Sequence, residues 1–115
     1  MLNKDGQREL AYVVRVTDVL DIEGVNNQVA IVNGWQVFVK RDEFKPGDLA
    51  VYFEIDSKLP ARDWSEFMIK KGYKVKTMKL NKFGVVSQGL ALPVDVFGIR
   101  IPDEEGIDLT DTLEV

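Results

Sequence analysis

Six lysines with no acidic residue among them are the residues of this chain best placed to do chemistry. They lie between Phe67 and Val94, a segment without Asp or Glu, although the 115-residue chain has a formal net charge of −4. The flanks are acidic, because residues 1–66 hold eight basic and twelve acidic side chains and residues 95–115 hold one and seven. Positive charge concentrated on one stretch is typical of a surface that binds a polyanion. We expect the phosphate backbone of a nucleic acid to be contacted by four of these lysines: Lys74, Lys76, Lys79 and Lys82.

A turn and nearby aromatic residues could add polar and stacking contacts to these lysines. Ser87 and Gln88 offer hydrogen bonds to phosphate or ribose, although a turn that satisfies its own polar groups is an equally simple interpretation. Phe83, in a predicted loop, is the candidate for an exposed ring that stacks on a base, and Tyr73 is the second candidate. We expect Trp35 to pack in the core instead.

No set of residues in the sequence fits a catalytic or metal site. Histidine and cysteine are absent, which removes the commonest general base, the commonest metal ligands and any disulfide. Glu54 and Asp56 lie two residues apart, but without a phosphate-binding glycine loop we expect them to pair with Lys58, Arg62 or a neighbouring domain and not to hold magnesium. We therefore expect this chain to catalyse nothing and to bind no cofactor or metal ion.

Length and composition indicate a single folded domain over residues 1–115. The hydrophobic fraction of 45% and the charged fraction of 30% are ordinary for a globular protein, and a chain of this length can form a core without disulfides. No apolar run approaches the roughly 20 residues that span a membrane, and the polar start has no signal-peptide core. We expect no membrane contact and a cytoplasmic location.

The pattern of apolar residues predicts mostly β-strands, separated by turns. Asn33-Gly34 is typical of a two-residue hairpin turn, and Pro46-Gly47 predicts a tight turn before the next strand. Gly89 is expected to adopt a positive φ at a sharp bend or bulge. Strands are expected over residues 10–19, 29–32, 35–40, 49–55, 73–80 and 85–92.

One short helix interrupts this series of strands. Asp63 to Glu66 has the spacing of a capping box, and Gly72 stands where a helix end favours a left-handed residue, so the predicted helix spans about residues 64–71. Five or six strands with one helix between them are typical of the small β-barrel called the OB fold. We predict an all-β, five-stranded OB-type barrel with one short helix inserted between the third or fourth strand and the next. A Src-homology-3-like barrel would fit the strand count without needing the helix.

Five short motifs, in their order and spacing, resemble the N-terminal OB module of a family of ATP-dependent RNA ligases. The motifs are NGWQV from Asn33, KPGD from Lys45, VYFEIDSKLP from Val51, KTMKL from Lys76 and SQGL from Ser87. The resemblance covers nearly the whole chain. No single motif is diagnostic, so the resemblance rests on their arrangement.

This resemblance implies that the chain works as part of a larger enzyme. In the ligase family the module precedes a nucleotidyltransferase domain, which seals breaks at a 3'-hydroxyl RNA end through a lysyl-adenylate and an RNA-adenylate. It implies that the module binds RNA or an RNA-containing nicked duplex, and that ATP and magnesium belong to a catalytic domain in cis or in trans. The catalytic Lys-x-Asp-Gly motif is missing, since the nearest match, Lys4-Asp5-Gly6, lacks the intervening residue.

Two further interpretations remain open. A lysine-rich strand followed by a Ser-x-Gly turn also resembles the tRNA-binding OB module attached to some aminoacyl-tRNA synthetases, which suggests a stand-alone tRNA-binding module. The alternative from a different class is a protein-interaction domain that uses the acidic tail, residues 102–115, as its contact. RNA binding is common to the ligase and tRNA interpretations and is therefore the firmer expectation.

Overall fold

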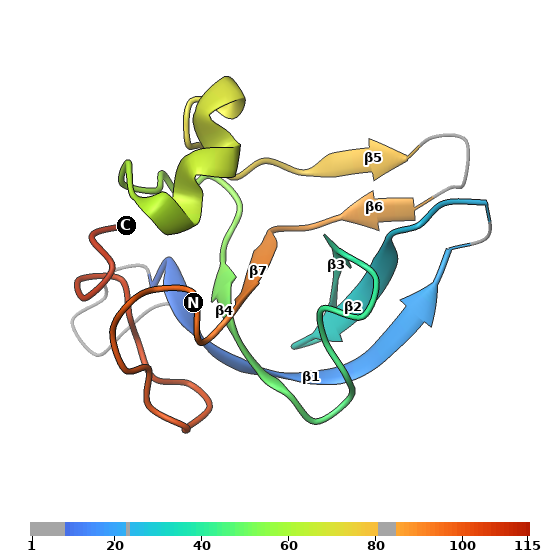
Figure 1. Ribbon diagram of the computed structural model, residues 1–115, viewed down its shortest axis with the longest axis horizontal. Helices are drawn as coiled ribbons and strands as arrows, with labels where there is room; N and C mark the ends of the chain where they lie inside the picture. Colours follow the sequence, from blue (N-terminus) through green and yellow to red (C-terminus); the bar gives the residue numbers. More distant parts are fainter. Residues whose placement is uncertain (1–8, 23, 81–84) are drawn as a thin grey trace.

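The computed structural model describes residues 9–22, 24–80 and 85–115, which form a curled β-sheet with one short helix (Figure 1). The helix, η1 (Asp63–Lys71), lies between the fourth and fifth strands along the chain. The strands are β1 (Ala11–Asp21), β2 (Gln28–Val32), β3 (Trp35–Val39), β4 (Leu49–Phe53), β5 (Met78–Leu80), β6 (Val85–Ser87) and β7 (Leu90–Pro93).

Five strands form one antiparallel sheet in the order β3-β2-β1-β4-β7, and β5 pairs with β6 in a separate hairpin. The long strand β1 connects two parts of the sheet, because its first half pairs with β4 and its second half with β2. Its register shifts between Val16 and Asp18, an irregularity of the kind that bends a strand. Figure 1 shows β1 as a long curved ribbon that runs beneath the other strands.

The sheet curls until its edge strands approach each other. The backbone N–H of Gln88 donates to the carbonyl of Gln36 (2.7 Å), and the backbone N–H of Phe38 donates to Ser87 Oγ (2.9 Å). These bonds tie β3 to the end of β6 and to the segment that joins β6 and β7. The predicted all-β, five-stranded OB-type architecture is confirmed, in the form of a half-closed barrel.

Alternation of side chains along β1 and β4 divides the core into two clusters, one on each face of the sheet. Val13, Val51 and Phe53 point toward η1 and the C-terminal segment, which adds Leu109 and Leu113 to the same cluster. The acidic tail is therefore anchored by apolar residues of its own. The opposite face fills the inside of the curl with Tyr12, Val14, Val32, Val37, Ala50 and Tyr52.

The predicted turn residues have the backbone conformations expected of them. Asn33 and Gly34 both have positive φ (48° and 78°), as a two-residue hairpin with this twist requires. Gly47 has a φ of 97°, and its turn closes with a bond from Asp48 N to Lys45 O (3.0 Å). Gly89 has a φ of 119°, which confirms the predicted positive φ at this position.

The helix lies where it was predicted, but its cap differs from the prediction. It follows β4, the fourth strand along the chain, whereas β3 and β4 are joined through the tight turn at Gly47. Its first residue is capped by Arg62 and not by Asp63. Ser65 Oγ accepts the N–H of Arg62 (3.0 Å) and donates to the carbonyl of Pro60 (2.5 Å), which satisfies a backbone donor at the start of the helix.

Two predicted strands are shorter or broken. The segment 85–92 is not one strand, because the conformation of Gly89 ends the pairing with β5 and begins a new pairing with β4. Of residues 73–80, only Met78–Leu80 form a strand, although Lys74 makes an isolated bridge with Lys58. In the part of the chain that the structure describes, no helix is long and apolar enough to cross a membrane.

Candidate functional site

A groove of about 540 Å³ opens beside the end of η1. It lies between η1, the segment that leads into β5, the edge strand β3 and the start of β7. No acidic residue is found among the described residues that line it. Its apolar walls include Phe38, Phe67, Met78 and Leu90, and its cationic rim, as we call it below, consists of Lys70, Lys71 and Lys76.

The end of η1 sets one wall of the groove. Met68 turns into the core with 5% of its surface exposed, whereas its neighbour Phe67 is 57% exposed and faces the groove. Gly72 then adopts the left-handed conformation (φ 64°), and the N–H of Tyr73 returns to the carbonyl of Met68 (3.0 Å). This C-terminal cap ends the helix and turns the chain back alongside η1.

Backbone hydrogen bonds to Val75 set the other wall. Asp56 N donates to Val75 O (2.7 Å), and Val75 N donates to Ser57 O (2.9 Å). Val75 is thereby held in the core at 2% exposure. Because side chains alternate along an extended segment, its neighbours Lys74 and Lys76 point outward, and both are exposed.

Several arginines pair with acidic side chains, and the lysines of the rim have no such pair among the described residues. Within the described residues, ion pairs join arginines to carboxylates and none involves a rim lysine: the pairs are Arg15–Glu105, Arg41–Asp21 and Arg62–Glu114. Lys71 Nζ donates to the sulfur of Met78 (3.0 Å), which is a weak acceptor. The rim charges are therefore available to an anion.

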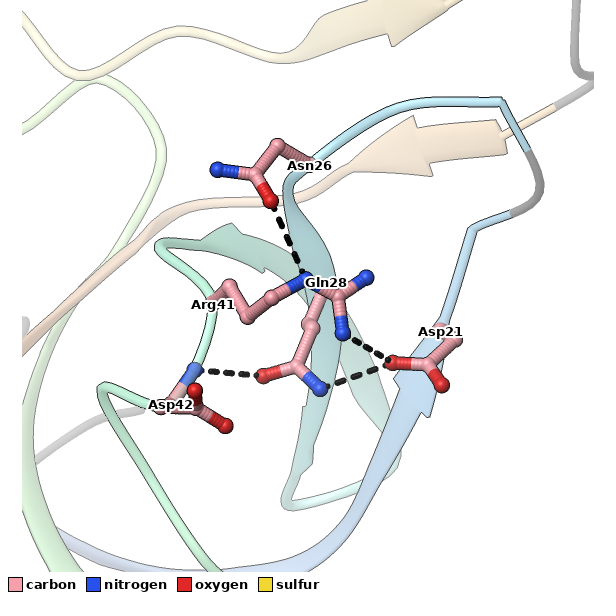
Figure 2. A network of polar contacts seen from close by, with 5 residues as sticks. All are labelled: Asp21, Asn26, Gln28, Arg41 and Asp42. Carbon is pink, nitrogen blue, oxygen red and sulfur yellow. Dashed lines mark hydrogen bonds and ion pairs between the residues drawn. The ribbon is translucent and has the colours of Figure 1, made fainter.

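Arg41, in contrast to the rim lysines, lies in a network of polar side chains, which Figure 2 shows. Its guanidinium donates to Asn26 Oδ1 (3.1 Å) and Asp21 Oδ1 (3.2 Å), while Gln28 bridges Asp21 Oδ1 (2.8 Å) and the N–H of Asp42 (2.9 Å). The hydrogen bond from Gln28 and the charge of Arg41 lower the pKa of Asp21. This network ties the end of β1 to the loop after β3, so Arg41 has a structural role at this end of the barrel.

The lysines predicted to bind nucleic acid are only partly brought together. Lys76 belongs to the cationic rim, and Lys74 lies next to it on the same segment. Lys79 is exposed on β5, which Figure 1 shows extending away from η1. Lys82 and Phe83, like Lys4, lie outside the described residues.

Ser87, Gln88 and Tyr73 have structural contacts. Ser87 is 3% exposed and its hydroxyl accepts the N–H of Phe38, while the carbonyl of Gln88 accepts the hydroxyl of Tyr52 (2.5 Å). Tyr73 is partly buried against the core. These contacts favour the interpretation of a turn that satisfies its own polar groups. The expectation for Trp35 is wrong, since it is 42% exposed at the end of the hairpin turn.

The sequence did not predict three apolar residues that line the groove, namely Phe38, Phe67 and Met78. It also did not predict that Lys70 and Lys71 lie at this groove. One signal was present in the sequence. Phe67, Met68 and Ile69 are consecutive apolar residues, and a helix cannot turn three consecutive side chains toward one core. At least one of them had to be exposed, as Phe67 and Ile69 are.

Glu54 has a different neighbour from those expected. Its carboxylate accepts the hydroxyl of Tyr12 (2.7 Å), and Arg62 binds Glu114. Burial, the hydrogen bond to Glu54 and the charge of Glu54 all raise the pKa of Tyr12 far above its ordinary value. Among the residues that the structure describes, no cluster of three acidic side chains could hold a metal ion.

Comparison with known proteins finds an OB-fold family model and similar solved structures. A family model described as an OB-fold domain matches residues 10–94. A mutant RNA ligase of Naegleria gruberi solved with AMP and manganese is 33% identical, with a TM-score of 0.81, and a mutant solved with ATP and manganese is 33% identical, with a TM-score of 0.82. An apo mutant is 32% identical, with a TM-score of 0.83 over 94% of this chain.

These matches are to part of a larger protein. The first two ligase structures cover 93% of this chain, and this chain spans 34% of the length of each of the three. No curated protein sequence matched the chain.

Proposed function

Because this chain belongs to the OB-fold domain family, we propose that it is an RNA-binding module that positions an RNA end for strand joining by the nucleotidyltransferase domain of an ATP-dependent RNA ligase. The observation that carries the proposal is the cationic rim, whose lysines lie around a groove that no acidic residue lines among the described residues. The similarity to the Naegleria ligases supplies the strand-joining context. The proposal also places the chain in the cytoplasm, together with its RNA.

The rim lysines would hold the phosphate backbone as flexible point charges. A lysine ammonium offers three donors on a long stem and contacts a phosphate without requiring a fixed geometry. Phosphate contacts fix the position of the nucleic acid and carry no base information. Lys74 and Lys79, exposed beyond the rim, would extend the same track.

The chemistry of joining would belong to a partner domain, in cis or in trans, together with its ATP and magnesium. A covalent nucleotidyltransferase needs an activated lysine, and the sequence offers no Lys-x-Asp-Gly motif. We expect the isolated chain to remain unlabelled after incubation with radiolabelled ATP and magnesium. A covalent adenylate on any lysine would contradict this division of roles.

Binding measurements at low salt test the proposal directly. We expect the chain to bind a nicked duplex with a 3'-hydroxyl RNA strand more tightly than the same duplex without a nick. Tighter binding of tRNA than of the nicked duplex would support the stand-alone tRNA-binding module. A chain that binds no RNA at low salt would contradict both hypotheses and leave a protein-interaction domain.

The acidic tail gives little support to that last interpretation. Leu109 and Leu113 are buried in the core, and the hydroxyl of Thr110 accepts the N–H of Leu10 (2.9 Å). A tail held in this way is part of the domain. Of these two surfaces, the acidic tail and the cationic rim, the rim is therefore the one that we propose binds a partner.

A further inference from the structure

The groove beside η1 has an apolar interior that phosphate binding alone does not require. Phe67 is 57% exposed and Met78 is 43% exposed, and both line the groove below the cationic rim. Large apolar side chains that remain accessible inside a concave site indicate a ligand with an apolar part. The ligand must therefore combine negative charge with a surface that can pack against a ring.

We infer that this groove takes up one unpaired nucleobase of the bound RNA, with its flanking phosphates on the cationic rim; this inference rests on the proposed function and specifies its substrate. The base would stack on the ring of Phe67, because every base offers a π-face to an aromatic side chain. Met78 can adapt to the base edge, since a thioether side chain is flexible and polarisable.

The size and charge of the site fit this occupant. A volume of about 540 Å³ lies within the range of roughly 300–1,000 Å³ that holds small ligands. Lys70 and Lys71 come from the helix and Lys76 from the facing segment, so positive charge stands on both sides of the apolar interior. Lys71 Nζ contacts only the weak acceptor Met78 Sδ in the described part of the chain, and a phosphate oxygen is a stronger one.

An unpaired nucleotide, such as the end of a strand, fits better than a fully paired duplex or an acidic peptide. A duplex keeps its bases stacked inside and presents mainly phosphate and sugar, which would leave Phe67 unused. Exposed lysines also continue past the groove to Lys79 with no acid between them, as an evenly charged phosphate chain requires. An acidic peptide remains a distinct outcome of the test below.

The test compares two short single strands of equal length and charge, one an RNA and the other a ribose-phosphate chain without bases. We expect the unmodified chain to bind the RNA about fivefold to 150-fold more tightly, as one stacked base would contribute. Phe67→Ala should remove this preference and leave binding of the base-free strand unchanged. Lys76→Ala should weaken binding of both strands by the same factor.

Controls separate the possible failures. Ile99→Ala removes an apolar side chain that is 49% exposed outside the groove and should change neither affinity. The thermal midpoint of Phe67→Ala should match that of the unmodified chain, because its ring is mostly exposed. Equal binding of the two strands by the unmodified chain would overturn the nucleobase site while the proposed RNA binding stands.

Three other results would also overturn the nucleobase site. A preference for RNA that survives Phe67→Ala would place the base elsewhere, and a preference lost in Trp35→Ala would place it at the hairpin. An acidic peptide of equal charge that competes as well as RNA would assign the groove to a protein partner. Failure of both strands to bind at low salt would overturn the proposed function itself.

Discussion

Gly89 is the residue at which the backbone conformation and the core constrain each other most closely. Its φ is 119°, and a Cβ atom at this position would lie 2.6 Å from the hydroxyl of Tyr52. That hydroxyl is fixed by its bond to the carbonyl of Gln88. Gly89→Ala should therefore cost about 1 to 3 kcal/mol of stability, measured as a lower denaturation midpoint.

Gly98 provides the matched control for this substitution. It also has a positive φ (71°), but nothing lies within 4 Å of the Cβ that alanine would add. Gly98→Ala should show the backbone strain alone, on the order of 1 kcal/mol. If Gly89→Ala lost no more stability than Gly98→Ala, close contact with Tyr52 would not be the cause.

Tyr12 should make stability depend on pH in the alkaline range. Its hydroxyl donates to Glu54, and burial and that carboxylate raise its pKa above the ordinary value near 10. Below about pH 10, Tyr12→Phe should lower the free energy of unfolding by about 1.5 to 3 kcal/mol, as expected for a hydrogen bond to a charged group. The ring contact with Tyr52 is kept in this variant.

The sign of the change above that pH follows from the protonation of each state. As the pH rises past the pKa of Tyr12 in the unfolded chain, the unfolded state loses a proton that the folded state keeps, so the unmodified chain loses stability relative to Tyr12→Phe. Denaturant titrations at several pH values should show the difference between the two proteins shrinking above about pH 10. A constant difference across this range would contradict the assigned environment of Tyr12.

At the scale of elements, the start of η1 depends on Ser65. This side chain is fully buried, and its hydroxyl bonds both Arg62 N and Pro60 O. Ser65→Ala should cost about 1 to 2 kcal/mol, as the loss of a helix cap does. It should also loosen the helix that carries Phe67, Lys70 and Lys71, so RNA affinity should fall together with the denaturation midpoint. An unchanged midpoint would show that Ser65 is not needed to hold the helix.

The sequence predicted elements well where a local rule determines them. The hairpin at Asn33-Gly34 and the end of η1 at Gly72 follow from turn and cap preferences, and both are found where expected. The break at Gly89 was predicted as a bend but not as the end of a strand. Pairing partners decide that outcome, because β6 pairs with β5 and β7 with β4, and local sequence does not specify partners.

At the scale of the whole molecule, the sequence predicted the charge of the site better than its shape. A run of lysines without acids can be counted in the sequence, and Lys76, one of these lysines, is exposed in the structure. The groove arises where η1, β3 and β7 meet, and these elements are distant along the chain. Phe38 and Phe67 therefore become neighbours of the lysines only through the tertiary fold.

The whole-molecule distribution of charge also determines how binding should respond to salt. Each phosphate contact with single-stranded RNA releases counterions, which lowers the slope of log K against log salt by about 0.7. With three or four lysines in contact, the slope should be about −2 to −3. A surface that only keeps the protein soluble would bind RNA weakly, and no single lysine would determine its slope.

The most direct test of a phosphate-binding rim is therefore the salt dependence of RNA binding by Lys76→Ala, with Lys45→Ala as the control. Lys76 lies on the rim, whereas Lys45 is an exposed lysine in the turn before β4. Lys76→Ala should flatten the slope by about 0.7 and weaken binding by the same factor for different RNA sequences, while Lys45→Ala leaves slope and affinity nearly unchanged. Equal effects of the two substitutions, or an unaltered slope in both, would show that the lysines of the rim do not bind RNA.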